Sequence, residues 1–305
     1  MSISSFYLDL PQLYSNLIRL FLILTIISSQ GASILLNRSI GKTRVYQLTS
    51  TRHSTRRSHA VWNRCRIIPF ALKTIEADLP EVTLKIALDA QGAVDDNSKG
   101  DSWRFTGPAS LDLVHRLRAR VDAVAVGSGT VLRDDPSLTV RRVPHETDQP
   151  LRVVFDRRYR TPAQSKILRD SHRTQLFVSE SRTRAEKSQN AEFSGKHVQA
   201  ISSASPQGLL EALSYLHNTR DVQHLMVEGG ASLASAFLNA GLVHRVIIIT
   251  APILFQDPVP SGINDCLLRK SGLSKIGEYS LDVDVVQCWS RPGLPWPSSN
   301  LSSWP

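Results

Sequence analysis

Two strand–glycine–helix units constrain most strongly what this chain can fold into. In the first, residues 122–126 predict a buried strand, because an unbroken apolar run leaves no solvated side before Gly127 ends it. Gly127 and Gly129 would let a ligand approach the backbone closely, and a short helix carrying Thr130 and Asp134 is expected to follow. Ligands bind at such strand ends in open α/β sheets, although a plain tight turn is the alternative.

The second unit comes near the end of the chain, where residues 224–227 predict a strand and residues 231–240 a helix. Glu228, Gly229 and Gly230 lie between them, and Ala231 and Ser232 open the helix. A glycine pair at a helix N-terminus is a compact site for the backbone amides that bind pyrophosphate. Glu228 would lie at the mouth of this site, and a buried capping glutamate is the alternative.

The rest of the chain alternates strand and helix patterns. Residues 82–88 alternate in polarity, which places Lys85 and Ala87 on the second face of a first strand; a surface lysine is the alternative reading of Lys85. A helix is expected from residues 107–108, with Arg118 one position beyond its apolar stripe. Further strands are expected at 151–155, 175–178, 243–250 and 281–289, and a helix at 208–217. This order predicts an α/β domain with a mostly parallel sheet, and the absence of a G-x-G-x-x-G disfavours an ordinary Rossmann dehydrogenase.

Charge is distributed very unevenly. Residues 1–75 contain ten Lys or Arg and one acidic residue, so they carry the whole formal net charge of +9. The remainder is neutral, and nucleic-acid binding by the folded body is not expected. Cys65, Cys266 and Cys288 have no C-x-x-C spacing, which disfavours both a disulfide framework and a metal site.

The first 76 residues have the composition of a targeting leader that is disordered. Residues 17–27 are strongly apolar but about half the length of a membrane-spanning helix. Small residues follow, and then a tract rich in Ser, Thr and Arg without acidic residues. We expect a cleaved leader directing the chain to a plastid, with the mitochondrion as the alternative, and no membrane segment in the mature form. Residues 77–291 would form the folded domain and residues 292–305 an irregular, unpacked tail.

Three separated runs, LVHRLRARVDA, GSGTVLRDDPSLTVR and LMVEGGASLASAFLNAGLV, closely resemble the pyrimidine reductase family of riboflavin biosynthesis. This is the reductase half of a bifunctional deaminase-reductase, which also exists as a separate enzyme, and the resemblance covers roughly residues 78–291. It implies a dihydrofolate-reductase-like fold, a homodimer, and NADPH-dependent reduction of a phosphorylated pyrimidine. In that reaction the ribosylamino side chain opens to an imine at C1′, receives hydride there and becomes a ribitylamino chain.

The resemblance also implies roles for individual residues. Lys85 and Glu228 are the candidate catalytic residues beside the sugar. The residues implied to bind substrate are Ser102, Arg118, Leu138 and Arg141, with Arg118 and Arg141 on the phosphate. The residues implied to bind NADPH are Ala87, Arg104 or its neighbour Trp103, Gly127, Gly129, Thr130, Asp134, Gly229, Gly230, Ala231 and Ser232. The turn at residues 88–92 departs from the family's pattern, which leaves the role of its acidic residue open.

Alternatives to this function remain at the level of sequence. The His-x-Glu and Pro-Cys-x-x-Cys elements of the zinc deaminase partner do not occur, so deamination is not expected. A reductase acting on a pterin and a non-catalytic nucleotide-binding relative are the rival readings. The residues do not distinguish a diaminopyrimidinone substrate from its deaminated uracil counterpart.

Overall fold

The computed structural model describes residues 79–99, 104–145, 148–181, 197–202 and 206–298, together with the backbone of three short strands nearer the N-terminus. The chain divides into two compact units, Met1–Phe70 and Ala71–Pro305. In the first, β1 (Phe6–Asp9) pairs in parallel with β2 (Ile34–Asn37), which pairs antiparallel with β3 (Arg44–Tyr46). The sequence did not predict these strands, and the rest of the expected leader lies outside the described residues.

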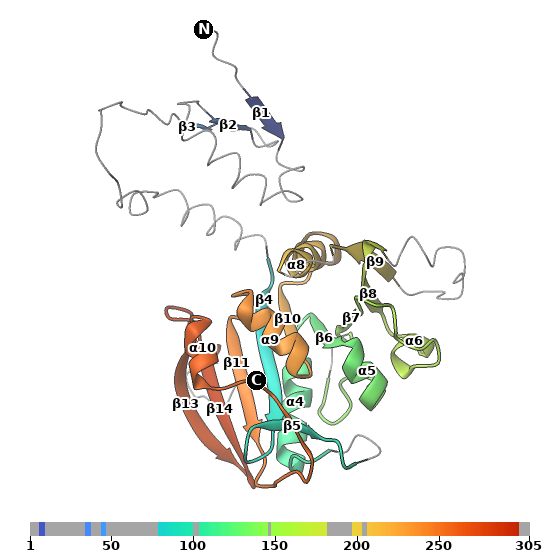
Figure 1. The fold of residues 1–305 in the computed structure, drawn as a ribbon, viewed down its shortest axis with the longest axis vertical. Coiled ribbons are helices and arrows are strands. Elements are labelled where there is room, and N and C mark those ends of the chain that lie inside the picture. Colours follow the sequence, from blue (N-terminus) through green and yellow to red (C-terminus); the bar gives the residue numbers. More distant parts are fainter. Residues whose placement is uncertain are drawn as a thin grey trace. The chain divides into compact units, whose positions relative to one another are not determined.

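The second unit is built on a mostly parallel sheet, as predicted (Figure 1). Among the described residues its strand order is β13-β14-β11-β4-β10-β6-β7-β8-β9, and the strands from β11 to β9 run parallel. The parallel strands are β4 (Glu81–Leu88), β6 (Ala123–Gly127), β7 (Leu151–Phe155), β8 (Thr174–Ser179), β9 (His197–Ile201), β10 (His224–Glu228) and β11 (Arg245–Thr250). An antiparallel hairpin of β13 (Ser274–Leu281) and β14 (Asp284–Ser290) closes one edge. A separate ribbon pairs β5 (Ala93–Asp96) with β12 (Pro258–Pro260).

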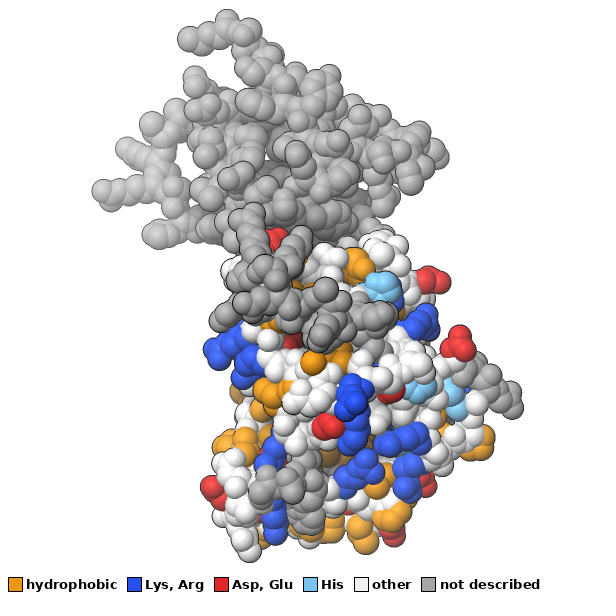
Figure 2. All heavy atoms as spheres, turned by 90° about the vertical axis from the view of Figure 1, so that its right-hand side faces the viewer, with side chains coloured by type: hydrophobic (Ala, Val, Ile, Leu, Met, Phe, Trp, Pro, Cys, Tyr) orange, Lys and Arg blue, Asp and Glu red, His pale blue; other side chains and the backbone are white. Residues whose placement is uncertain are grey.

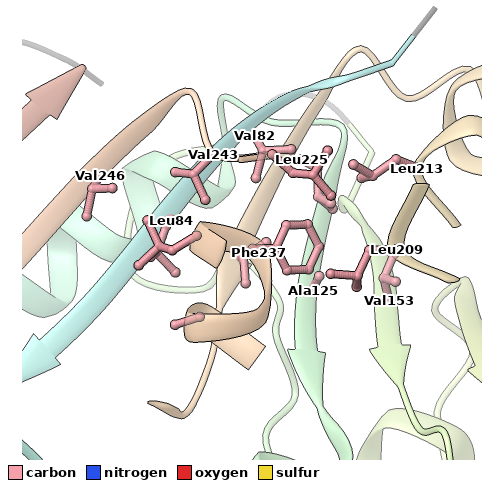
Figure 3. Packing of buried hydrophobic residues seen from close by; sticks show 14 of the residues in the cluster. Val82, Leu84, Ala125, Val153, Leu209, Leu213, Leu225, Phe237, Val243 and Val246 are labelled. Carbon is pink, nitrogen blue, oxygen red and sulfur yellow. The ribbon is translucent and has the colours of Figure 1, made fainter. Parts of the chain in front are cut away.

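Helices cover both faces of this sheet. On one face α8 (Gln207–Arg220), α9 (Ala231–Asn239) and α10 (Asp265–Lys270) contribute to a core in which Phe237 of α9 lies against the strands (Figure 3). On the other face α4 (Pro108–Arg118), α5 (Ser128–Asp134) and α6 (Lys166–Arg169) share a second core. Within the described ranges, each helix is too short or too polar to cross a bilayer.

The side chains of β4 alternate between the two faces of the sheet, and only one of these faces can hold polar functional groups. Val82, Leu84, Ile86 and Leu88 all point into the first core, as the period-two pattern predicts. The intervening residues, including Lys85 and Ala87, therefore face the side on which α4 and α5 pack. Both glycine units end on central strands of the same sheet, since β10 lies between β4 and β6.

The C-terminal region differs from the sequence expectation. The strand expected over residues 281–289 is wrong in its boundaries: β13 ends at Leu281, Asp282 takes a left-handed conformation with φ 56°, and β14 begins at Asp284. The tail is also not wholly unpacked, because Trp296 packs against the second core and the carbonyl of Pro295 accepts a hydrogen bond from Arg245 at 3.2 Å. β13 was not predicted because its half-buried positions mix Lys275 and Gly277 with Tyr279 and Leu281, which leaves only a weak apolar alternation in the sequence.

A carboxylate from this hairpin caps the helix that carries Arg118. Helix α4 has Gly107 as its N-cap, and no side chain of the helix itself caps it. Asp284 supplies the missing acceptor, because its buried Oδ2 receives the Gly107 N–H at 2.8 Å. The hairpin and α4 are thereby joined at the helix N-terminus, where a negative charge is also favoured by the helix dipole.

Asp284→Ala is expected to lower the free energy of unfolding by about 1–2 kcal/mol, because it leaves a helix N-terminus without its acceptor. Asp284→Asn keeps a carbonyl oxygen at the same place and should lose less. Urea unfolding of the three proteins at neutral pH measures both differences. Equal stability of the wild-type and alanine proteins would contradict the capping role.

Candidate functional site

A cavity of about 700 Å³ opens at the carboxyl ends of β4, β6 and β10. All the site residues predicted from sequence line it except Ser102, which lies outside the described residues, as does Trp103, the alternative to Arg104. Residues from both glycine units, from β4 and from α4 therefore meet around one space. Its volume lies within the range of ligand-binding pockets. This establishes position only, and the roles of these residues stay predictions.

Lys85 and Glu228 lie side by side in this cavity. They are register partners on the parallel strands β4 and β10, so their side chains project from the same face of the sheet. Burial lowers the pKa of the Lys85 ammonium, the negative charge of Glu228 opposes that shift, and the positive charge of Arg118 adds to it. Lys85 therefore releases a proton more readily than an ordinary surface lysine.

Glu228 is held by a two-point ion pair with Arg118. Arg118 Nε donates to Glu228 Oε1 at 2.6 Å and Nη2 donates to Oε2 at 2.8 Å, while the two side chains are only 10% and 12% exposed. Burial alone would raise the pKa of Glu228, but the charge and hydrogen bonds of Arg118, together with the Lys85 charge, hold that pKa below its usual value. The carboxylate is therefore ionised at neutral pH.

Arg118 has contacts within the protein that the sequence did not predict. Its Nη1 also donates to the Thr139 carbonyl at 3.0 Å, so each of the three guanidinium nitrogens has a partner within the protein. These contacts orient Glu228 and hold the segment around Thr139, and the predicted role of Arg118 in binding phosphate stays a prediction. Sequence could not show the pair, because the two partners lie 110 positions apart.

An irregular segment, residues 138–142, carries two of the predicted substrate residues. Leu138 is buried and takes a left-handed conformation with φ 54°, which is uncommon for a residue with a branched side chain. The backbone of Val140 is fixed on both sides by Gln149, since Val140 N donates to Oε1 at 2.7 Å and Nε2 donates to the Val140 carbonyl at 3.2 Å. Side-chain hydrogen bonds thus hold this segment where no strand or helix does.

Two arginines in the cavity lack an acidic partner among the described residues. Arg133 pairs with Asp95 at 2.9 Å, in addition to the pair of Arg118 with Glu228. Arg104 and Arg141 have no ion-pair partner within the described ranges, and burial together with the Arg104 charge lowers the pKa of Arg141. Two neighbouring cations without an anion form a suitable site for a phosphate group.

The two glycine units form a cradle between the starts of α5 and α9. Gly230 is the N-cap of α9, and a Cβ built on it would lie 3.7 Å from Thr130 Oγ1 of α5. Glycine therefore leaves the strip between the two helices open, and the first amides of α9 lack partners within the helix. Such amides favour phosphate, so the residues present fit the pyrophosphate of a dinucleotide.

Basic residues also gather outside the cradle. The connection between β7 and β8 exposes Arg157, Arg158 and Arg160, and Arg160 Nη2 donates to Ser128 Oγ at 3.2 Å at the start of α5. Figure 2 shows several Lys and Arg side chains on this side of the molecule, where α5 and α6 lie in Figure 1. The positive charge favours an anionic ligand at the adjacent cavity.

The acidic residue of the turn after β4 has a structural task. Asp89 is 1% exposed, and its carboxylate accepts the N–H groups of Gln91 at 2.9 Å, Ala93 at 2.8 Å and Phe255 at 3.1 Å. It does not line the cavity. The turn therefore holds a carboxylate that fixes its own backbone and that of Phe255.

The family model for the RibD C-terminal domain matches residues 80–273. The chain belongs to the RibD C-terminal domain family. It is 35% identical over 228 residues to the 2,5-diamino-6-ribosylamino-4(3H)-pyrimidinone 5′-phosphate reductase of Archaeoglobus fulgidus, with 70% of this chain and 99% of that protein covered.

Relatives of the RibD family also include longer proteins. The chain is 37% identical over 185 residues to the riboflavin biosynthesis protein RibD of Mycobacterium tuberculosis, covering 59% of this chain and 44% of that protein. It spans about half the length of the curated RibD relatives that it matches. The solved structure of Acinetobacter baumannii RibD superimposes with a TM-score of 0.57 at 29% identity, covering 72% of this chain and 60% of that one. The predicted mostly parallel sheet flanked by helices is thus confirmed as the fold of a RibD domain.

Proposed function

We propose that this RibD-family chain is an NADPH-dependent reductase of riboflavin biosynthesis that converts the ribosylamino side chain of a phosphorylated aminopyrimidine to a ribitylamino chain. The observation that carries the proposal is the placement of Lys85 opposite Glu228, beside an open glycine cradle and two arginines without an acidic partner among the described residues. The name of the archaeal relative supports the diaminopyrimidinone as substrate. The uracil form is the second candidate, since a solved RibD-type protein from Thermotoga maritima is named as a reductase of that compound.

The protein's own groups have distinct tasks in this reaction. NADPH, when bound, supplies hydride, and the amides at the start of α9 with Thr130 of α5 would hold it. Lys85, whose pKa is lowered, can donate a proton to the side-chain nitrogen of the substrate. Glu228, held ionised by Arg118, stabilises the positive charge that develops when that nitrogen is protonated.

Phosphate binding would position the reacting carbon. Arg141 and Arg104 line the cavity and have no acidic partner in the part of the chain that the structure describes, so they are the candidate phosphate ligands. Arg104 moves in this proposal from the cofactor to the substrate. Binding energy from the remote phosphate can then hold C1′ in place.

The experiment for this function is a reaction of the purified chain with NADPH and each of the two pyrimidine phosphates. Consumption of NADPH and a ribityl product identified by mass spectrometry are expected for at least one of them. Turnover only with a dihydropterin, or binding without turnover, would refute the proposal in favour of one of its rivals.

The cofactor assignment makes a separate prediction. Thr130→Ala and Asp134→Ala are each expected to raise the KM for NADPH by about three- to tenfold, because each removes one hydrogen-bonding group from the cofactor side of the cavity. The KM for the pyrimidine should change less. Steady-state kinetics with each substrate varied in turn measures the two constants, and unchanged NADPH requirements in both variants would contradict the placement.

We also propose that the chain forms a homodimer. The edge formed by β13 and its hairpin exposes Ile276, Val283 and Val285, which are 41%, 59% and 39% accessible. An exposed edge strand with apolar side chains favours pairing with a second copy. Light scattering on the purified domain would give a monomer mass if this proposal is wrong.

We propose that residues 1–76 are a leader that directs the chain to a plastid and is then removed. The mature chain would have no deaminase activity and no membrane segment. Support comes from the confinement of the net charge to this segment and from the family match, which starts at residue 80. A fluorescent protein fused to this leader that stays in the cytosol would refute the proposal.

A further inference from the structure

Helix α4 holds residues 138–142 at three points spaced one turn apart. Asp112 Oδ1 accepts from Arg142 Nε at 2.6 Å, His115 Nδ1 accepts from the Arg141 backbone N–H at 3.0 Å, and Arg118 donates to the Thr139 carbonyl at 3.0 Å. Residues three positions apart on a helix lie on one side. This side of α4 therefore fixes the position of the segment from which Arg141 reaches the cavity.

The middle contact differs from the outer two. The side chains of the Asp112–Arg142 pair are 38% and 37% exposed, and Arg118 also pairs with Glu228. His115 is 5% exposed and accepts a hydrogen bond from the backbone of Arg141 itself. Because Nδ1 accepts that N–H, the imidazole must be neutral with its proton on Nε2.

We propose that neutral His115 is a positioning residue for substrate phosphate: by accepting the Arg141 amide it fixes the backbone from which the Arg141 guanidinium reaches the cavity. This inference rests on the proposed function, since it takes Arg141 as a phosphate ligand. His115 itself does not line the cavity. It was not found from sequence, where it reads as one polar residue within a helical pattern.

The surroundings of His115 keep it neutral. The charged groups that face it are Arg118 from α4, Arg141 and Arg142 from the neighbouring segment, and Glu228 from β10. Burial and the positive charges of the three arginines together lower the pKa of His115 to about 4, although the negative charge of Glu228 opposes them. Protonation as the pH falls toward this value would remove the acceptor, so phosphate binding should weaken on the acid side.

Two substitutions at His115 distinguish the role of the hydrogen-bond acceptor from that of the imidazole ring. His115→Ala removes the acceptor, and the KM for the pyrimidine phosphate should rise about three- to tenfold while kcat changes less than about twofold. His115→Asn places Oδ1 where Nδ1 stood and does not titrate, so it should keep a KM near wild type at neutral pH and lose the rise in KM at acid pH. His217→Ala, a half-buried histidine of α8 that does not line the cavity, is the matched control and should leave KM unchanged.

Hydrogen–deuterium exchange tests the same contact without turnover. The peptide covering residues 138–142 should exchange faster in His115→Ala and at the wild-type rate in His115→Asn, so the inference can be tested even if the proposed activity is not found. An unchanged KM and exchange rate in His115→Ala would overturn it. So would equal defects in the Ala and Asn variants, or an acid-side rise in KM that persists in His115→Asn.

Discussion

Lys85→Met is expected to lower kcat about 100-fold or more while the protein stays folded, because it removes the candidate proton donor from the cavity. Methionine is apolar and of similar length, and Lys85 lies among strands that are otherwise buried on this face. Removing a partly desolvated ammonium costs little stability, since Glu228 keeps Arg118 as its partner. The loss should therefore appear in turnover and not in the unfolding midpoint.

The pH dependence gives this prediction a second measurement. A proton donor must be protonated before reaction, so kcat of the wild-type protein should fall as the pH rises through the pKa of Lys85. Burial lowers that pKa from the usual 10.5, which moves the alkaline limb toward neutral pH. The residual activity of Lys85→Met should lack this limb.

A matched variant controls for the loss of one positive charge. Lys275 lies on β13, does not line the cavity and pairs with the exposed Glu278. Lys275→Met should retain kcat within about twofold, as expected for an exposed ion pair. Full turnover by Lys85→Met would exclude Lys85 as the proton donor.

The positions of these groups followed from local sequence patterns. The period-two polarity of β4 placed Lys85 on the face of the strand that points away from the first core. The two glycine units marked the carboxyl ends of β6 and β10. Strand boundaries there differed from expectation by about one residue. Patterns of this kind depend only on residues close together in the sequence, so they predict local secondary structure without knowledge of the tertiary packing.

The pairing of the groups did not follow from local patterns. The pair of Arg118 with Glu228 and the contact of His115 with Arg141 were not predicted, because both depend on how α4 packs across the sheet. The ribbon of β5 and β12, which brings Asp95 to Arg133, was also not predicted. Sequence thus indicated which residues reach the cavity, but tertiary packing decides which charges neutralise one another.

Glu228→Gln tests the most consequential of these pairings. The amide keeps the shape of the side chain but removes the negative charge that opposes the developing cation, so kcat should fall about 10- to 100-fold. One acceptor for Arg118 remains, and the free energy of unfolding should therefore fall by only about 1–3 kcal/mol. The pKa of Glu228 lies below its unfolded value of about 4.5, so this stabilisation is present at neutral pH and is lost as the pH falls below that value.

A double-mutant cycle with Arg118→Met separates catalysis from stability. Arg118→Met alone leaves the largely buried Glu228 carboxylate without its guanidinium partner and should cost about 3–5 kcal/mol of unfolding free energy. Adding Glu228→Gln removes the uncompensated charge, so the double variant should regain much of that stability but no turnover. If turnover returned together with stability, the ion pair would serve only to hold the fold, and Glu228 would have no part in the reaction.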